Sequence, residues 1–330
     1  MYLLSIWSLS NHFQNKVLPS ILFNRKIKIV SVMSNKDYKE FKLKNIIFYN
    51  NKKKFFLKNK FDYVYISSIN SEHYNHCKFA LENNKNVICE KPICLNIRQL
   101  SKLKTIAIKK KKKFFEVIQY VHHPLFARLK NIIKSNSIGK VLRVKSSFKI
   151  PLNDKKNFRF NKNLGGGSLN DVGFYPISIM FTLFNSKKIK LLKSKITRQN
   201  KVDMQGEIKA QNENKVIFDL SWGFDSSYKN NLTIYGTKGN LLVDFIFSKN
   251  INQDGKIIIN VNRKLEVIKI SKSNQINLAF KDMLSNKNKL FNKRYLTSYR
   301  ILNMIEKLKK KLFFYFSLLI FNTPINASCG

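Results

Sequence analysis

The chain has 330 residues, enough for two domains of about 150 residues that each bury a core. Hydrophobic residues make up 44% of it and aromatic residues 13%, which excludes a disordered or fibrous protein. Its 62 basic and 19 acidic residues give a formal charge of +43, so nucleic acid and anionic membranes have to be considered as partners.

The positive charge comes almost entirely from lysine. Only nine of the 62 basic residues are arginines, while asparagine occurs 40 times. Lys, Asn, Ile and Phe rise together when coding drifts towards A/T-rich codons, whereas proteins that recognise phosphates usually keep arginine for its bidentate fork. We therefore favour compositional drift and expect no specific nucleic-acid partner. Polyanion binding stays the alternative.

The four cysteines show neither a redox pair nor a zinc pattern. No Cys-x-x-Cys is present, and no histidine stands at zinc-ligand spacing from two of them; they are Cys77, Cys89, Cys94 and Cys329. At the N-terminus, apolar residues 2–7 follow no cation and precede no small-residue cleavage site, which argues against a signal peptide. We expect reduced thiols, a cytoplasmic protein and no metal site.

A lysine cluster at 307–311 leads into an apolar run at 312–321. The run has about ten residues, whereas a bilayer span needs about 20. Residues 312–330 are therefore predicted to form an apolar tail. Weak contact with a membrane, packing against the protein or a partner, and no function at all remain alternatives for it.

Short β-rich runs alternate with helical patterns over the first 120 residues. Strands are predicted at 3–7, 26–33, 62–67, 86–89 and 114–120, and helices at 11–23, from 37, at 71–83 with Ser71 as N-cap, and at 96–110. Strands that alternate with helices indicate βαβ units, which the right-handed crossover rule turns into a doubly wound parallel sheet. We therefore predict a Rossmann-like dinucleotide-binding domain over residues 1–121.

The pattern changes after Pro124. Helices are predicted at 125–134, 168–184 and 291–311, and strands at 140–150, 189–198, 204–210, 215–222, 230–236, 239–247 and 256–270. Consecutive strands joined by short polar turns, such as 212–214, indicate an antiparallel sheet. Residues 122–311 are therefore predicted to form an α+β substrate and oligomerisation domain. Its sheet is expected to be open and mostly antiparallel, with a homo-oligomer forming through it. The fold class of the whole chain is α/β.

The first strand–helix turn is the place where a dinucleotide fold holds phosphate. Ser8, Ser10 and Phe13 occupy the three glycine positions of Gly-x-Gly-x-x-Gly, so the fingerprint is lost. The free amides and the dipole of the helix start survive any change of side chain. An ordinary turn that binds nothing is the alternative at this point.

Two further motifs carry chemistry. Glu90-Lys91-Pro92 ends a predicted parallel strand, at the edge where open α/β sheets bind ligands. Three of the 11 glycines, 165–167, precede a predicted helix on which Asp171 and Tyr175 are four residues apart and share a face. The alternatives are a solvated lysine for the first motif, and a glycine loop before a capped helix with a core tyrosine for the second.

These motifs, in this order, resemble the glucose–fructose oxidoreductase/inositol dehydrogenase/MocA-type oxidoreductase family over roughly residues 3–310. Further matching segments lie at 65–73, 80–83, 87–92, 116–124, 138–141 and 235–239. Glu-Lys-Pro is moderately specific alone and highly specific together with Gly-Gly-Gly-x-Leu-x-Asp-x-Gly-x-Tyr. With a tyrosine at position 175, the chain resembles the dihydrodiol dehydrogenase, glucose–fructose oxidoreductase and nucleotide-sugar ketoreductase branches. The inositol dehydrogenase branch generally has histidine at this position.

The resemblance implies an NAD(P)-dependent oxidoreductase. It would transfer a hydride between nicotinamide and an alcohol or ketone carbon of a sugar-like or nucleotide-sugar substrate. Tyr175 would exchange the hydroxyl proton, Lys91 would lower the pKa of that phenol and stabilise the alkoxide, and Asp171 would orient the site. The substrate would contact His123, Arg159 and Tyr175.

The resemblance also implies a set of cofactor contacts. These are Ser8, Ser10, Asn11, His12, Ser34, Lys36, Ser68, Asn70, His73, Glu90 and Lys91. Residues 31–36 offer no carboxylate for a ribose 2′-hydroxyl, whereas Ser34 and Lys36 could meet a 2′-phosphate, so NADP is slightly favoured over NAD. The lost glycines support a second hypothesis, a non-catalytic relative that acts as a binding or scaffolding protein.

Overall fold

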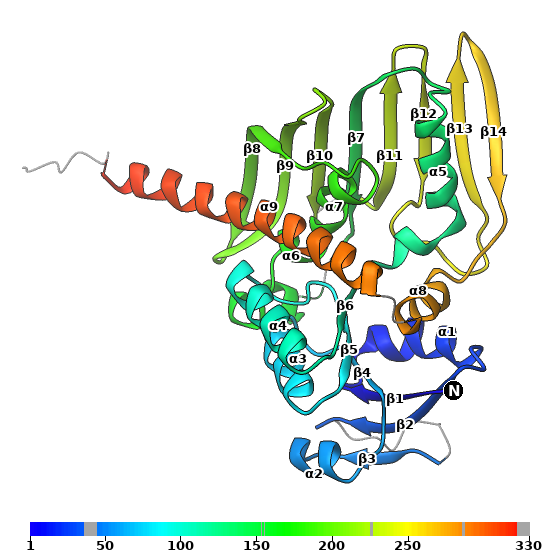
Figure 1. The fold of residues 1–330 in the computed structure, drawn as a ribbon. Helices are drawn as coiled ribbons and strands as arrows, with labels where there is room; N and C mark the ends of the chain where they lie inside the picture. Colours follow the sequence, from blue (N-terminus) through cyan, green and yellow to red (C-terminus); the bar gives the residue numbers. More distant parts are fainter. Residues whose placement is uncertain (36–44, 153, 155, 225–226, 286–287, 322–330) are drawn as a thin grey trace, which may run out of the picture.

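Two β-sheets organise the chain, one in the lower and one in the upper half of Figure 1. The computed structural model describes residues 1–35, 45–152, 154, 156–224, 227–285 and 288–321. The predicted helix from residue 37 begins outside these residues. The two sheets confirm the predicted combination of a parallel sheet and a second, open sheet.

The first sheet has six parallel strands in the order β3-β2-β1-β4-β5-β6. The strands are β1 Tyr2–Trp7, β2 Ile27–Met33, β3 Ile47–Tyr49, β4 Tyr63–Ile66, β5 Asn86–Glu90 and β6 Phe114–Val117. The strand order reverses between β1 and β4, and ligands bind such sheets beyond the carboxyl ends of the strands at that reversal. The predicted doubly wound sheet is confirmed. Its last strand is shorter than predicted and gives way to a 3₁₀ turn, η2 Gln119–His122.

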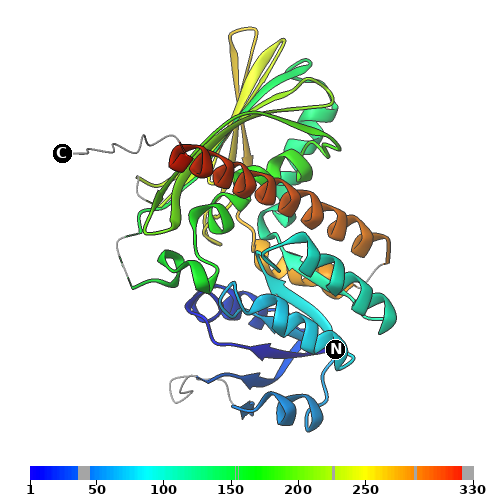
Figure 2. The ribbon, with the colours of Figure 1, turned by 90° about the vertical axis from the view of Figure 1, so that its left-hand side faces the viewer.

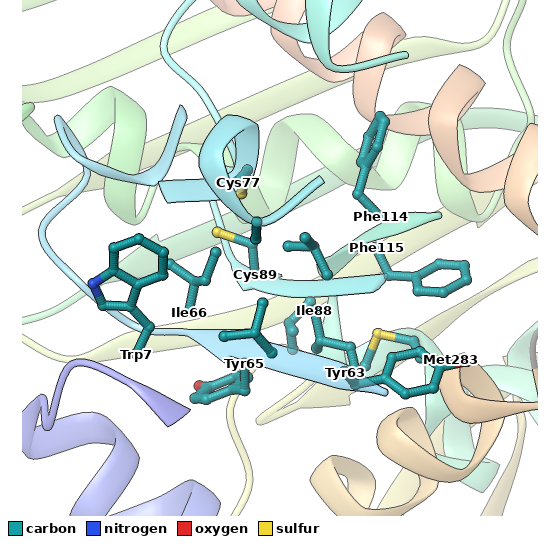
Figure 3. Packing of buried hydrophobic residues seen from close by; sticks show 14 of the residues in the cluster. Trp7, Tyr63, Tyr65, Ile66, Cys77, Ile88, Cys89, Phe114, Phe115 and Met283 are labelled. Atoms are coloured by element: carbon teal, nitrogen blue, oxygen red, sulfur yellow. The ribbon is translucent and has the colours of Figure 1, made fainter. Parts of the chain in front are cut away.

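All four residues of β4 are buried, the pattern of a parallel strand that is covered on both faces. Figure 3 shows the surrounding core, in which Trp7 and the sulfur atoms of Cys77 and Cys89 pack beside the central strands. The covering helices are η1 Phe13–Val17, α1 Leu18–Leu22, α2 Lys52–Leu57, α3 His73–Glu82 and α4 Ile97–Lys109. The sequence pattern does not predict β3 and α2, because β3 is too short and α2 opens with three lysines.

The predicted cap of α3 is wrong. The helix begins at His73 after Glu72, whose side chain makes no capping hydrogen bond. The Ser71 backbone N–H instead donates to the carbonyl of Leu164 at 3.3 Å, so this turn is used to contact the glycine loop.

The second sheet has eight strands in the order β14-β13-β12-β11-β7-β10-β9-β8. They are β7 Val141–Lys149, β8 Ile189–Gln199, β9 Val202–Asn212, β10 Ile217–Gly223, β11 Lys229–Gly236, β12 Gly239–Asp244, β13 Gly255–Val261 and β14 Lys264–Ile270. Only β7 and β10 pair in parallel, so the sheet is mostly antiparallel as predicted. The single strand predicted at 256–270 is a hairpin instead, because Asn262 and Arg263 adopt positive φ angles and turn the chain.

The helix predicted at 168–184 is broken into α6 Ser168–Asp171 and α7 Phe174–Thr182. Pro176 accounts for the break, because it has no N–H for the carbonyl four residues earlier and its ring clashes with that carbonyl. Asp203 in β9 caps α6: its Oδ2 accepts from the Ser168 hydroxyl at 2.8 Å and from the Leu169 N–H at 2.5 Å.

The remaining helices join the two halves. α5 Pro124–Lys134, α6 and α7 cover one face of the second sheet, while α8 Gln275–Leu284 packs into the core of the first. α9 Asn288–Phe321 contacts α7 on one side and α4 and β6 on the other, and both views show it between the sheets (Figures 1 and 2). The division at residue 121/122 stays a prediction.

The last helix is longer than predicted at both ends. Its backbone continues beyond residue 311 because the apolar run contains no glycine or proline before Pro324. Within the described ranges, none of the helices combines the length and the apolar character that a bilayer crossing needs. Residues 322–330, with Cys329, lie outside the described part, and the role of the tail stays a prediction.

Candidate active site

Lys91 follows β5 at the carboxyl edge of the parallel sheet, as the sequence predicted. Its Nζ donates to the carbonyl of Asp171 at 3.0 Å and to Oδ1 of the same residue at 2.5 Å. The same Nζ lies 4.9 Å from the ring centroid of Tyr175. The structure thus brings together all three residues that the sequence analysis named as catalytic, one from the first sheet and two from the α6–α7 segment.

Asp171 stands between two cations. Arg159 donates from Nε to Oδ2, while Lys91 holds the other oxygen, and the Asp171 side chain is only 12% exposed. Burial by itself would raise the pKa of Asp171, but the charges of Lys91 and Arg159 hold that pKa well below its usual range. Asp171 is therefore ionised, and it fixes the positions of the ammonium and the guanidinium.

Tyr175 lies among aromatic rings. Its ring centroid is 5.0 Å from that of Phe148, 5.6 Å from Phe247 and 6.2 Å from Tyr120. Burial, together with the nearby carboxylates of Glu90 and Asp171, raises the pKa of Tyr175 well above 10. The net shift is therefore upward and not downward as the sequence analysis expected, because desolvation of the phenolate outweighs the charge of the neighbouring Arg159.

Glu90 connects the first turn to the site. Its Oε1 accepts from the Tyr65 hydroxyl at 2.7 Å and lies 3.6 Å from Nε2 of His12. Burial lowers the pKa of His12, but the Glu90 carboxylate outweighs it and the net shift is upward. Burial would likewise raise the pKa of Glu90, but His12 and Tyr65 bring it down. The contact between His12 and Glu90 therefore connects the helix after β1 to the end of β5.

His73 and Asn70 hold the loop after β4. The ring nitrogens of His73 lie 2.8 Å from the carbonyl of Pro92 and 2.8 Å from that of Ser68. Asn70 donates from Nδ2 to the carbonyl of Gly165 at 3.0 Å. Gly165 has φ +77°, and a Cβ there would lie 2.8 Å from that of Asn70, so only glycine allows this approach. These residues position the loops from which Lys91 and Asp171 extend.

The first turn keeps a glycine-type conformation although it has no glycine. Ser8 has φ +82°, its N–H donates to the carbonyl of Met33 at 2.8 Å, and its own carbonyl accepts from the Ser67 hydroxyl at 2.9 Å. Ser10 caps the helix that follows, because its Oγ accepts from the Phe13 N–H at 3.1 Å. Ser8 thus keeps the left-handed backbone that the first glycine of the fingerprint would supply.

Phe13 is fully buried at the third glycine position. Its ring packs 5.6 Å from that of Tyr65. The helix is π-helical from Phe13 to Val17, and we attribute this wider turn to the ring between helix and sheet.

The other proposed cofactor residues are spread along the same edge. Asn11 begins the helix after Ser10, and Ser68 bonds through Oγ to Nδ1 of His76 at 2.9 Å. Ser34 follows β2 and donates its N–H to the carbonyl of Tyr49 at 3.0 Å. Lys36 lies outside the described residues.

We expect Ser8→Gly to tighten NADP binding by about 1 kcal/mol. The change removes a Cβ where the backbone must approach a pyrophosphate. It also relieves a left-handed conformation that costs an L-residue roughly 1–2 kcal/mol, which should stabilise the free and the bound protein alike. Calorimetric titration with NADP measures the effect. Asn136→Gly is the matched control, because Asn136 also has a left-handed backbone, with φ +57°, and lies after α5, outside the proposed cofactor contacts. Weaker binding by Ser8→Gly would contradict this account of the turn.

Two predicted substrate residues have other contacts in the structure. His123 is 3% exposed, and its Nδ1 accepts from the Leu125 N–H at 3.1 Å, so it caps α5. Its Nε2 is buried without a hydrogen-bond partner within the described part of the chain. Arg159 lies in the short turn η3 Phe158–Phe160 and pairs with Asp171.

Sequence reasoning missed three residues that support the site. Tyr65 holds Glu90, Asp203 caps α6, and Lys309 of α9 donates to Oδ1 of Asn170 at 2.8 Å. Each contact joins residues far apart along the chain. No local motif could have indicated them.

Comparison with known proteins agrees with this architecture. The model "Oxidoreductase family, NAD-binding Rossmann fold" matches residues 10–118, and the model "GFO/IDH/MocA C-terminal domain" matches residues 126–242. A 3-ketoreductase from Actinomadura kijaniata, solved with NADP and TDP-benzene, superposes with a TM-score of 0.87 at 18% identity. That superposition covers 94% of this chain and 97% of the other, and it establishes a common fold.

Two curated relatives give sequence matches. A dTDP-3,4-didehydro-2,6-dideoxy-alpha-D-glucose 3-reductase from Saccharopolyspora spinosa is 26% identical over 211 residues, which are 64% of this chain and 63% of the reductase. A trans-1,2-dihydrobenzene-1,2-diol dehydrogenase from Xenopus tropicalis is 27% identical over 54% of each chain. The chain thus matches less than two thirds of either relative's length. Because the models for both domains match successive parts of it, the chain belongs to the GFO/IDH/MocA oxidoreductase family.

Proposed function

We propose that this protein is an NAD(P)-dependent oxidoreductase that reduces a ketone, or oxidises the corresponding alcohol, on a sugar-like or nucleotide-sugar substrate. One observation carries the proposal: the ammonium of Lys91 lies between the carboxylate of Asp171 and the ring of Tyr175. The 3-reductase and the diol dehydrogenase among the relatives act on C–OH or C=O groups, which supports the same chemistry.

Each residue has a task in this chemistry. Tyr175 carries the proton that moves to the substrate oxygen during reduction. Lys91 stabilises the negative charge that develops on that oxygen, and it is held in place because Asp171 accepts two of its hydrogen bonds. Arg159 holds the other oxygen of Asp171 and so acts as a positioning residue.

The residues present fit a nicotinamide cofactor, because Ser8 in the turn after β1 keeps the left-handed backbone of the first fingerprint glycine. When bound, the cofactor supplies or accepts the hydride. The residues that would hold it at the ends of β1, β4 and β5 are Ser8, Ser10, Asn11, His12, Ser68, Asn70, His73, Glu90 and Lys91. Ser34 at the end of β2 would meet the ribose end, and we favour NADP over NAD.

Calorimetric titration with NADP and NAD tests the proposal directly. We expect measurable binding of at least one of them and consumption of NADPH with a panel of keto-sugars and nucleotide-linked keto-sugars. Absence of binding for both cofactors would overturn the oxidoreductase and favour the non-catalytic relative.

The two directions of the reaction should respond differently to pH. The pKa of Tyr175 is raised above 10, so the phenol keeps its proton throughout the neutral and mildly alkaline range. We therefore expect the turnover number for reduction to stay flat between about pH 6 and pH 10, and that for oxidation to rise. Measuring kcat in both directions decides this. A reductive rate that falls near pH 8 would show that the phenol titrates lower than its environment dictates.

We also propose that a second copy packs on the open face of the second sheet. The register places Asp219 between Lys145 and Lys209, and Lys195 opposite Glu207, so charges of both signs alternate there. We expect light scattering to show an oligomer that Lys145→Glu combined with Lys209→Glu dissociates. A monomeric wild-type protein would contradict this. Cytoplasmic localisation stays a prediction.

A further inference from the structure

Two exposed aromatic rings stack at one end of the second sheet. Tyr228 precedes β11 and Phe245 follows β12, so both lie at the open end of one hairpin (Figure 1). Their ring centroids are 6.0 Å apart and their planes are inclined by 27°. Tyr228 is 45% exposed and Phe245 38%, although a folded chain usually buries rings of this size.

Buried hydrogen bonds hold this pair in place. Asn230 is 5% exposed and donates from Nδ2 to the Tyr228 hydroxyl at 3.0 Å and to the carbonyl of Ser248 at 2.9 Å. Its Oδ1 accepts from the Phe247 N–H at 2.9 Å. Phe245 itself has φ +54°, which is rare for a bulky side chain and typical of positions where function imposes strain. The rings are therefore preorganised.

The pair is close to the candidate catalytic tyrosine. The Tyr228 ring lies 6.3 Å from that of Phe148, which lies 5.0 Å from that of Tyr175, so the centroids of Tyr228 and Tyr175 are no more than about 11 Å apart. In a nucleotide-linked sugar a diphosphate and a ribose separate the sugar from the base, and these flexible links can fold to bridge such a distance. A substrate that reacts at Tyr175 could reach the stacked rings with its other end.

A cation completes the group. Nζ of Lys249 lies 5.8 Å from the ring centroid of Phe245 and donates to the carbonyl of Asp254 at 3.3 Å. Burial, with a contribution from the charge of Lys249, lowers the pKa of His123 to about 4. Lys249 therefore lies near a neutral imidazole, and the carboxylates of Asp244 and Asp254 act on its ammonium as well.

We propose that Tyr228, Phe245 and Lys249 form a subsite for the nucleoside diphosphate of a nucleotide-linked sugar. The base stacks on the rings and a phosphate meets the ammonium, while the sugar reaches Tyr175. Aromatic rings bind bases through their π-faces, and a neighbouring cation adds the charge that a diphosphate requires. The inference rests on the proposed function and selects the nucleotide-sugar class from the two classes proposed above.

Binding of dTDP and UDP to the full-length protein tests this subsite, with saturating NADP present so that the cofactor site is not available to them. We expect Tyr228→Ala and Phe245→Ala each to weaken dTDP binding by about tenfold or more, the effect of losing one stacked base. Tyr228→Phe keeps the ring and should retain most of the affinity. Lys249→Met should weaken dTDP binding more than thymidine binding, because only dTDP carries the charge.

Tyr235→Ala is the matched control. Tyr235 lies on β11, the strand that Tyr228 precedes, with a lysine ammonium 5.6 Å from its ring, and belongs to neither the stacked pair nor the site. Circular dichroism should show that all the variants fold.

Three outcomes would overturn the subsite while the proposed function stands. The first is dTDP affinity that is absent, or equal in all variants, in a protein that binds NADP. The second is turnover of an aromatic diol that depends on Tyr228 without any nucleotide binding. The third is a change of molecular mass in Tyr228→Ala, which would assign the rings to a second copy. Failure of the wild-type protein to bind NADP would overturn the proposed function instead. In that case dTDP binding would still be measured, in the absence of NADP.

Discussion

Lys91→Met should reduce turnover by a factor of about 10²–10³, the usual effect of removing one group that stabilises a developing oxyanion. Methionine keeps the unbranched stem but loses the charge that lies 2.5 Å from Asp171 and 4.9 Å from the Tyr175 ring. Arg159 still pairs with Asp171. An unpaired buried charge costs about 3–5 kcal/mol, and the free energy of unfolding should fall by less than this because Asp171 keeps one partner.

Steady-state kinetics together with cofactor titration test this prediction. NADP affinity should weaken by less than about tenfold, or 1.4 kcal/mol. Lys85→Met is the matched control, because Lys85 also donates to a carbonyl, at 3.0 Å, and lies 4.3 Å from the ring centroid of Phe61, remote from Lys91. If Lys91→Met lost cofactor affinity but turned over normally at saturation, Lys91 would be a binding residue.

Tyr175→Phe should cut turnover by about a hundredfold or more, the contribution of a general acid. The substitution removes one hydroxyl and adds no volume, so the ring keeps its contacts with Phe148 and Phe247. We expect near-wild-type thermal unfolding and NADP binding. The loss should appear in kcat, because the proton is needed in the transition state and not for binding.

Tyr120→Phe distinguishes loss of the acid from disturbance of the aromatic cluster. The Tyr120 hydroxyl bonds to Ser178 at 2.6 Å and to Thr182 at 2.8 Å, and its ring lies 6.2 Å from that of Tyr175. Loss of the Tyr120 hydroxyl should lower the free energy of unfolding by about 1 kcal/mol and leave most of the turnover. Equal turnover in Tyr175→Phe and wild type would exclude Tyr175 as the proton donor.

Two local errors of the sequence interpretation have local causes. Pro176 breaks the helix predicted at 168–184, and a two-residue turn at Asn262 and Arg263 divides the strand predicted at 256–270. Both signals stand in the sequence, where proline removes a backbone donor and asparagine tolerates a positive φ. The pattern does not predict β3, α2 and α8. The other long helices and strands lie where the hydrophobic pattern predicts them, because burial on one or two faces sets that pattern.

The sequence by itself determined the alternation of strands and helices, the strand end at Lys91 and the glycine run before Asp171, because these depend on neighbours along the chain. Only the tertiary structure decided that Arg159 pairs with Asp171, that Tyr65 holds Glu90, and that Phe13 is accommodated by a π-helical turn. The tertiary structure also decided the shift in the pKa of Tyr175, because the direction of that shift depends on how completely the ring is removed from water. Pairings across the fold and desolvation arise when distant segments pack together, and no local pattern of residues encodes them.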